Sequence, residues 1–193
     1  MLAASPDSVD INFRLGQVHR AKNDPQGAIG YFQKAASLNA KDGRAWAYLA
    51  SAQQDVGRLE EAKADYKRAL ALYPSHAVLM NNFAYLMAET GGDLEEALKY
   101  AQGGLHLQPE NPNFADTVGL VLLKKENTDT ALQIIGGLSK KYPDNPSFRY
   151  HFAMALLKKG DRTRAKSELN ATQSLKRSRE EDKKIQDLLR DIG

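Results

Sequence analysis

The chain has 193 residues, and its 27 Lys and Arg against 24 Asp and Glu give a formal net charge of +3. This near balance excludes the strong basic excess that is typical of nucleic-acid-binding proteins, and no nucleic-acid partner is expected. The 26 Ala and 24 Leu, against only 18 Val, Ile and Thr together, favour helices over strands. The absence of Cys excludes disulfides, thiolate metal sites and Cys nucleophiles. No apolar run approaches the ~18 residues of a membrane span, so no transmembrane segment is predicted.

From residue 9 onward, the sequence repeats with a period of 34 residues. Alanines recur with spacings of 34, 35, 34 and 34 residues at Ala28, Ala62, Ala97, Ala131 and Ala165. A second register of small residues recurs with spacings of 34, 34, 35 and 34 at Gly16, Ala50, Ala84, Gly119 and Ala153. Both registers place the one extra residue at the loop 90–93, where an insertion costs little. The period predicts five repeats, at residues 9–42, 43–76, 77–111, 112–145 and 146–177.

Each period contains two segments with helical spacing. In the second repeat, Trp46, Leu49 and Ala50 begin the first segment, and Leu59 and Ala62 begin the next. Polar residues that cap helix N-termini precede the first helix of each repeat, namely Ser8, Asp42, His76 (or Ser75 beside it), Asn111 and Asn145. The pattern predicts two antiparallel helices in every repeat.

A 34-residue helix–turn–helix of this kind resembles the tetratricopeptide repeat. The second repeat carries the motif most fully, through Trp46, Leu49, Ala50, Ala62, Tyr66, Ala69 and Pro74. The resemblance covers roughly residues 8–175 and implies an all-α, right-handed superhelical solenoid of five such repeats. It also implies a non-catalytic scaffold that binds a protein or peptide partner in its concave groove.

The C-terminal segment 178–193 is predicted to be a capping helix that covers the last repeat. Ser178 and Glu181 form a capping-box pattern at its start. Its apolar residues then follow helical spacing, at Ile185, Leu188, Leu189 and Ile192. A helix with one apolar stripe and an otherwise charged surface is what the end of a repeat array requires.

The N-terminal segment 1–7 is predicted to be the remnant of a preceding repeat. Pro6 precedes the first repeat as Pro74 and Pro109 precede theirs, so we expect the chain to be the C-terminal part of a longer array. The first helix would then present an uncovered apolar edge, formed by Ile11, Leu15 and Val18. Such an edge predicts a homodimer contact.

No motif for catalysis, for a cofactor or for a metal is present, so the chain is not expected to be an enzyme. The four histidines, at residues 19, 76, 106 and 151, occupy four different positions of the repeat and form no metal-ligand spacing. The acidic pairs at 60–61, 95–96 and 180–181 each fall in the first turn of a predicted helix, where they oppose the helix dipole.

Two pairs of glycines fall inside predicted second helices, at residues 103–104 and 136–137. A glycine inside a helix costs about 1 kcal/mol relative to alanine. The second helices of the third and fourth repeats are therefore predicted to be the least stable elements of the array.

The resemblance also implies which side chains face the groove. In repeats one to three these include, beside the residues predicted to bind the partner, Asp10, Arg20, Arg44, Ala47, Ser51, Gln54, Asp55, Val78 and Glu89. The predicted partner-binding residues are Phe13, Gln17, Asn81, Tyr85, Asn113, Asp116, Leu120, Leu123, Tyr150, Met154 and Leu157. The apolar members gather in repeats three to five, which predicts a peptide segment bound in the C-terminal half. The alternative is that the cap helix or the curvature of the array already covers these side chains.

Binding of an acidic C-terminal tail by a carboxylate clamp is not expected. The Lys and Asn of such a clamp are replaced here by Phe13 and Gln17, and Val78 and Asn82 replace its later basic pair. Two other functions stay open: an architectural spacer within a longer bacterial envelope or secretion protein, and a regulatory appendage of an enzyme domain upstream.

Short stretches are similar to bacterial arrays associated with exopolysaccharide export and the PEP-CTERM sorting system. They are residues 81–91, 114–119 and 149–155. This similarity implies a bacterial protein and leaves the cytoplasm, the periplasm and the envelope open as its location.

Overall fold

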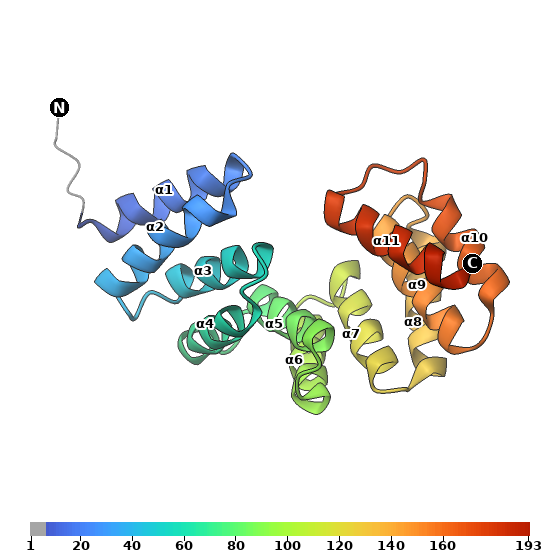
Figure 1. The fold of residues 1–193 in the computed structure, drawn as a ribbon. Helices are drawn as coiled ribbons and strands as arrows, with labels where there is room; N and C mark the ends of the chain where they lie inside the picture. The colour runs from blue at the N-terminus through green and yellow to red at the C-terminus, as the bar shows by residue number, and fades with distance from the viewer. Residues whose placement is uncertain (1–6) are drawn as a thin grey trace. The chain divides into compact units, whose positions relative to one another are not determined.

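The computed structural model describes residues 7–193, and within this range it contains eleven helices and no strand. The predicted all-α class is confirmed. The predicted remnant 1–7 lies outside the described residues except for Asp7. The helices, labelled in Figure 1, are α1 (Val9–Ala21), α2 (Pro25–Leu38), α3 (Gly43–Asp55), α4 (Leu59–Leu72), α5 (Ala77–Thr90), α6 (Leu94–Leu107), α7 (Pro112–Lys124), α8 (Thr128–Lys141), α9 (Pro146–Lys158), α10 (Arg162–Ala171) and α11 (Arg179–Ile192).

Polar side chains begin the helices where the sequence predicts them. The caps of the five first helices each accept a hydrogen bond from a backbone N–H of the first turn, at Ser8, Asp42, His76, Asn111 and Asn145. These bonds satisfy N–H groups that have no partner inside the helix. Gly91, with a φ of +70°, ends α5, because glycine adopts this left-handed conformation without steric cost.

The chain divides into two compact units, one from the first described residue to Asp93 and the other from Leu94 to Gly193. The division falls in the loop 90–93, where the repeat has its one extra residue. The first unit contains α1–α5 and the second contains α6–α11.

Within the first unit, consecutive helices pack side by side, as Figure 1 shows for α1 with α2 and α3 with α4. Small residues make this approach possible. A Cβ atom added to Gly16 would lie 2.5 Å from Cε1 of Phe32, so a larger residue where α1 meets α2 would force the Phe32 ring to shift. The fully buried Phe32 forms a core with Ile29 and Leu49, and the rings of Phe13 and Tyr48 pack against it.

In the second unit, α11 packs onto the last helix pair. Its Ile185 and Ile192 are buried in one cluster with Leu156 and Leu169, and Leu188 and Leu189 pack against that cluster. The Ser178 side chain and the Glu181 side chain cap the helix reciprocally, as the capping-box pattern predicts. The amphipathic segment therefore forms a helix whose apolar stripe is turned toward the repeats.

Candidate functional site

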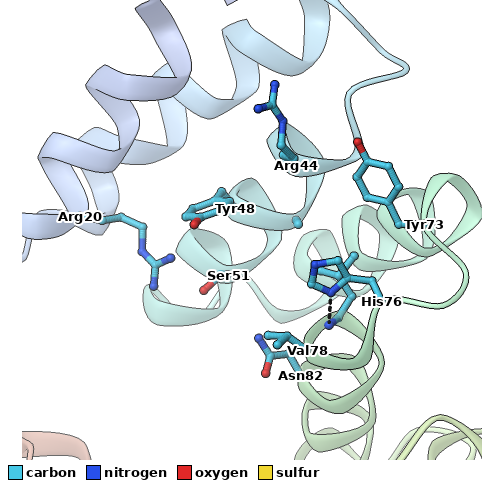
Figure 2. Close-up of a pocket in the computed structure, with 10 residues that line it drawn as sticks. Arg20, Arg44, Tyr48, Ser51, Tyr73, His76, Val78 and Asn82 are labelled. Atoms are coloured by element: carbon cyan, nitrogen blue, oxygen red, sulfur yellow. Dashed lines mark hydrogen bonds between the residues drawn. The ribbon is translucent and has the colours of Figure 1, made fainter. Parts of the chain in front are cut away.

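A pocket of about 650 Å³ lies on the face of the first unit where α1, α3 and α5 present their side chains (Figure 2). Arg20 comes from α1, and four residues come from α3. The rest come from the turn between α4 and α5 and from α5 itself. The lining residues are Arg20, Arg44, Ala47, Tyr48, Ser51, Tyr73, His76, Val78, Leu79 and Asn82.

Arg44 is fixed by the residue that caps its own helix. Its Nε donates to Oδ1 of Asp42 at 3.0 Å and its Nη2 donates to Oδ2 at 2.7 Å, which makes the pair bidentate. These side-chain hydrogen bonds hold the pKa of the Asp42 carboxyl below its ordinary value. The guanidinium also lies over the ring of Phe13, 5.3 Å from its centroid. Arg44 is therefore held in one orientation at the edge of the pocket.

Arg20 is held more loosely. Its Nη2 donates to Oδ2 of Asp55 at 3.4 Å, and its guanidinium carbon lies 5.8 Å from the centroid of the Tyr48 ring. The Tyr48 ring is itself wedged against Phe13 and Phe32, with ring centroids 5.0 and 5.4 Å away. Figure 2 shows Tyr48 between the two arginines, with Arg20 beside Ser51. Most of the N–H groups of Arg20 have no partner among residues 7–193.

His76 presents a further donor. Its Nδ1 accepts a hydrogen bond from the backbone N–H of Leu79 at 3.3 Å, drawn as a dashed line in Figure 2. A neutral imidazole that accepts at Nδ1 carries its proton on Nε2. The Nε2–H of His76 is then a donor on a ring that lines the pocket.

Tyr66 supports the wall of the pocket through hydrogen bonds to residues that line it. Its hydroxyl lies within hydrogen-bond distance of Gln54 (3.3 Å to Oε1), and Ser51 and Asn82 also bond to it. Burial raises the pKa of Tyr66 to about 12, although these two hydrogen bonds lower it. The hydroxyl therefore stays protonated at neutral pH and ties α3 to α5.

The site combines hydrogen-bond donors with apolar and aromatic walls. Its described lining contains two guanidinium groups and an imidazole but no Asp or Glu. Asp10, Asp42 and Asp55 pair with the arginines without lining the pocket. Such a surface is suited to binding a polar or acidic group beside an apolar one.

The partner-binding residues predicted in the first unit lie outside this pocket. The ring of Phe13 supports Tyr48 and Arg44, Gln17 is exposed, and Tyr85 is half-buried. Asn81 is buried, and its Oδ1 has no hydrogen-bond partner among residues 7–193. The pocket instead uses Arg20 and four other residues of the same groove mapping, Arg44, Ala47, Ser51 and Val78.

In the second unit, the expectation that Leu120 and Leu123 are exposed is wrong, because they are 0% and 2% exposed. The position of a residue in the repeat does not tell whether other segments cover its side chain. Asn113 is exposed and Met154 is half-buried. Tyr150 and Leu157 pack against the cluster that contains Ile185 of α11. The cap helix thus covers part of the face that was predicted to bind a partner.

Asp116 forms a buried pair with a histidine on the next first helix. Its Oδ2 lies 2.7 Å from Nδ1 of His151, and the two residues are 6% and 4% exposed. The pair joins α7 to α9 inside the second unit. Asp116 is therefore a structural residue here, and its Oδ1 has no hydrogen-bond partner within residues 7–193.

Sequence reasoning missed five lining residues, namely Tyr48, Tyr73, His76, Leu79 and Asn82. Tyr73 follows α4 and His76 precedes α5, so both stand in a turn rather than on a first helix. Tyr48 and Asn82 lie one residue beyond the mapped groove positions Ala47 and Asn81. A search of the turns as well as the helices for aromatic residues could have found Tyr73 and His76.

Among residues 7–193, no three His, Asp or Glu side chains gather as they would around a metal ion. No helix in this range is long and apolar enough to cross a membrane.

The paired helices with a 34-residue period define a helical-repeat protein, and comparison with known proteins names the class. A model described as "Tetratricopeptide repeat" matches residues 27–179, and a second model with the same description matches residues 1–45. The chain belongs to the tetratricopeptide repeat family. This fold is generally that of a non-catalytic scaffold for protein–protein interaction.

Solved structures share this fold at low sequence identity. A tetratricopeptide repeat protein from Parabacteroides merdae superimposes with a TM-score of 0.79 at 17% identity, covering 99% of this chain and 77% of that one. A thermophilic repeat protein from Thermus thermophilus gives 0.73 at 19% identity, covering 96% and 98%. YrrB, described as having an unusual peptide-binding site, gives 0.67 at 17% identity, covering 86% and 85%.

One curated relative is the cytochrome c-type biogenesis protein CycH of Rhizobium meliloti. It is 35% identical over 98 residues, which are 50% of this chain. The match spans 26% of the length of that relative.

Proposed function

We propose that the chain binds a segment of a partner protein on the α1–α3–α5 face of its first unit. The observation that carries this proposal is the 650 Å³ pocket, whose walls combine exposed apolar side chains with oriented donors. Val78 is 43% exposed and Tyr73 is 38% exposed there, although large apolar side chains are usually buried. Tyr and Arg are also enriched where proteins bind each other.

The binding is proposed to be passive recognition without chemistry on the partner. The donor at Arg44 is oriented by hydrogen bonds to the cap residue Asp42, and the ring of His76 is oriented by the hydrogen bond that it accepts from the N–H of Leu79. This reduces the entropy lost when a ligand binds. The description of YrrB as a peptide-binding protein of the same fold supports a peptide segment as the ligand. The groove of the C-terminal half, predicted from sequence, is supported less well because Leu120 and Leu123 are buried.

Photo-crosslinking from single positions tests the proposal. A benzoylphenylalanine would replace Val78 in the pocket, Met154 on α9, or Ala64 on the exposed side of α4. Each full-length variant is irradiated in a lysate of the source organism. We expect a discrete protein adduct from position 78 that is absent from position 64. Equal adducts from all three positions, or an adduct from position 154 alone, would contradict the proposal.

We also propose, as a second candidate, that the chain serves the biogenesis of c-type cytochromes. The observation in its favour is the 35% identity over 98 residues to CycH. Deletion of the gene, followed by haem staining of membrane and soluble fractions, tests this role. Loss of the covalently bound haem bands, restored by the intact gene, is expected, and unchanged bands would refute it.

A further inference from the structure

The lining of the pocket indicates what kind of segment it binds. We propose that the pocket takes an internal stretch of a partner polypeptide in which one Asp or Glu is flanked by apolar residues. The acidic side chain would bind Arg20 and the donors near it, and its apolar neighbours would pack on Tyr48 and Val78. This inference rests on the proposed function, because it names the chemistry of the partner at the same face.

The charge of the lining is the first argument. The described lining residues carry two guanidinium groups and no carboxylate. A guanidinium has five N–H donors, and Arg44 uses two of its nitrogens on Asp42 while its Nη1 has no hydrogen bond to residues 7–193. Donors without acceptors on a partly desolvated wall favour an anionic group there.

The weak restraint on Arg20 is the second argument. Its one hydrogen bond among the described residues is the 3.4 Å contact with Asp55, whose side chain is 45% exposed. Long, exposed ion pairs of this kind contribute about 0–1 kcal/mol, so a carboxylate in the pocket can share or replace this contact. When no ligand is bound, the contact with the Tyr48 ring keeps the Arg20 guanidinium at the pocket.

The walls between the donors require apolar neighbours. Ala47, Tyr48, Val78 and Leu79 offer apolar surface, and Ser51 and Asn82 stand beside them. A free inorganic anion would leave this surface in water, whereas a peptide would cover it. The Lys and Asn of a carboxylate clamp are absent from the first repeat, so nothing in the lining requires the free C-terminus of the partner. An internal acidic residue satisfies both the donors and the apolar wall.

Selection from a phage library of random dodecapeptides tests the inference on the full chain. Arg20→Gln removes the guanidinium that is proposed to bind the carboxylate of the peptide. Arg14→Gln is the matched control, since Arg14 is an exposed arginine of the same helix that does not line the pocket. Thermal unfolding is compared first, so that both variants are known to be folded.

We expect the selected peptides to contain an Asp or Glu next to aliphatic or aromatic residues. Binding of the tightest peptide is measured by fluorescence polarisation. Arg20→Gln should raise its Kd about 10-fold or more, while Arg14→Gln should change the Kd less than 2-fold. Replacing the acidic residue of the peptide by its amide should have the same effect as Arg20→Gln and should remove most of the salt dependence.

Two results would overturn the inference in different ways. Peptides without acidic residues that lose affinity on Val78→Gln but not on Arg20→Gln would refute the acidic ligand and keep the proposed binding face. If none of the selected peptides depends on Val78 or Arg20 for binding, both the acidic ligand and the proposed binding face are refuted.

Discussion

In each repeat, the first helix presents one side to the predicted groove. The two units differ in whether other side chains cover that side. On the first unit, α1, α3 and α5 leave a pocket lined by Arg20, Tyr48 and Val78. On the second unit, Leu157 and Tyr150 of α9, which occupy the repeat positions of Arg20 and Ala47, pack against the cluster that contains Ile185 of α11. The same side of the first helices is therefore open in a pocket of one unit and packed against the last helices of the array in the other.

This difference separates what the repeat pattern determines from what it leaves open. The pattern determines which side of a first helix a residue occupies. Whether that side is open depends on segments outside the repeat, such as α11.

Removing the anchor of α11 should have the largest effect on stability. Ile185 is 1% exposed in the core of the second unit, so Ile185→Ala is expected to lower the free energy of unfolding by about 2–5 kcal/mol. Urea unfolding measures the change. Lys183→Ala, an exposed change in the same helix, is the control and should stay within about 0.5 kcal/mol of the parent. Similar losses in both variants would refute the covering role of α11.

The buried Asp116–His151 pair should hold α7 to α9. Asp116→Ala leaves the His151 imidazole without this hydrogen bond in a buried site, which we expect to cost about 1–3 kcal/mol. Asp129→Ala removes an exposed partner of Lys159 instead and should cost about 0–1 kcal/mol. Chemical denaturation of the two variants compares them. If Asp116→Ala were as stable as Asp129→Ala, the assignment of Asp116 as a structural residue would fail.

Two adjacent glycines of α8 offer a matched pair. A Cβ on Gly137 meets nothing within 4 Å, so Gly137→Ala should stabilise the helix by about 0.5–1 kcal/mol. A Cβ on Gly136 would lie 2.9 Å from Cε2 of Phe152, so Gly136→Ala should gain less or lose stability. Thermal melts rank the two variants. The opposite order would show that Phe152 does not limit this position.

The cap of α3 predicts a small pH effect in the first unit. Hydrogen bonds from Arg44 lower the pKa of Asp42 below its ordinary 3.8 in the folded state. The resulting stabilisation is complete above about pH 4 and is lost as the pH falls through the lowered pKa. Asp42→Asn should therefore lose less stability than the parent between about pH 4 and pH 2, measured by urea unfolding at each pH. The other acidic residues are common to both proteins. If the stability of the two proteins fell equally with pH, the lowered pKa of Asp42 would be contradicted.

Much of the fold could be predicted because its signals are local. Ser8, Asp42 and Asn145 each mark a helix start by a hydrogen bond within a few residues of the chain. The loop 90–93 was recognised by its extra residue, although the division of the chain into two units there was not predicted. The close approach of Phe32 leaves no room for a side chain at Gly16, which agrees with the register of small residues in the sequence.

The candidate site could be predicted only in part because burial is not local. The repeat positions of Arg20, Arg44 and Val78 predict that they face the groove, but the cluster of apolar residues in the C-terminal half gives the stronger sequence signal for a binding surface. Leu120 and Leu123 have the spacing of exposed groove residues and are buried. Their surroundings depend on tertiary packing, which the repeat pattern does not encode.

The most direct test of the central claim is to map where a peptide binds. The uniformly ¹⁵N-labelled full chain is titrated with the tightest peptide from the selection, and amide shifts are followed by two-dimensional NMR. We predict that the largest changes fall on the face of the first unit, around Tyr48, Ser51 and Asn82. Largest changes on α7 and α9, around Asn113 and Met154, would contradict the claim that the open face of the first unit is the binding site.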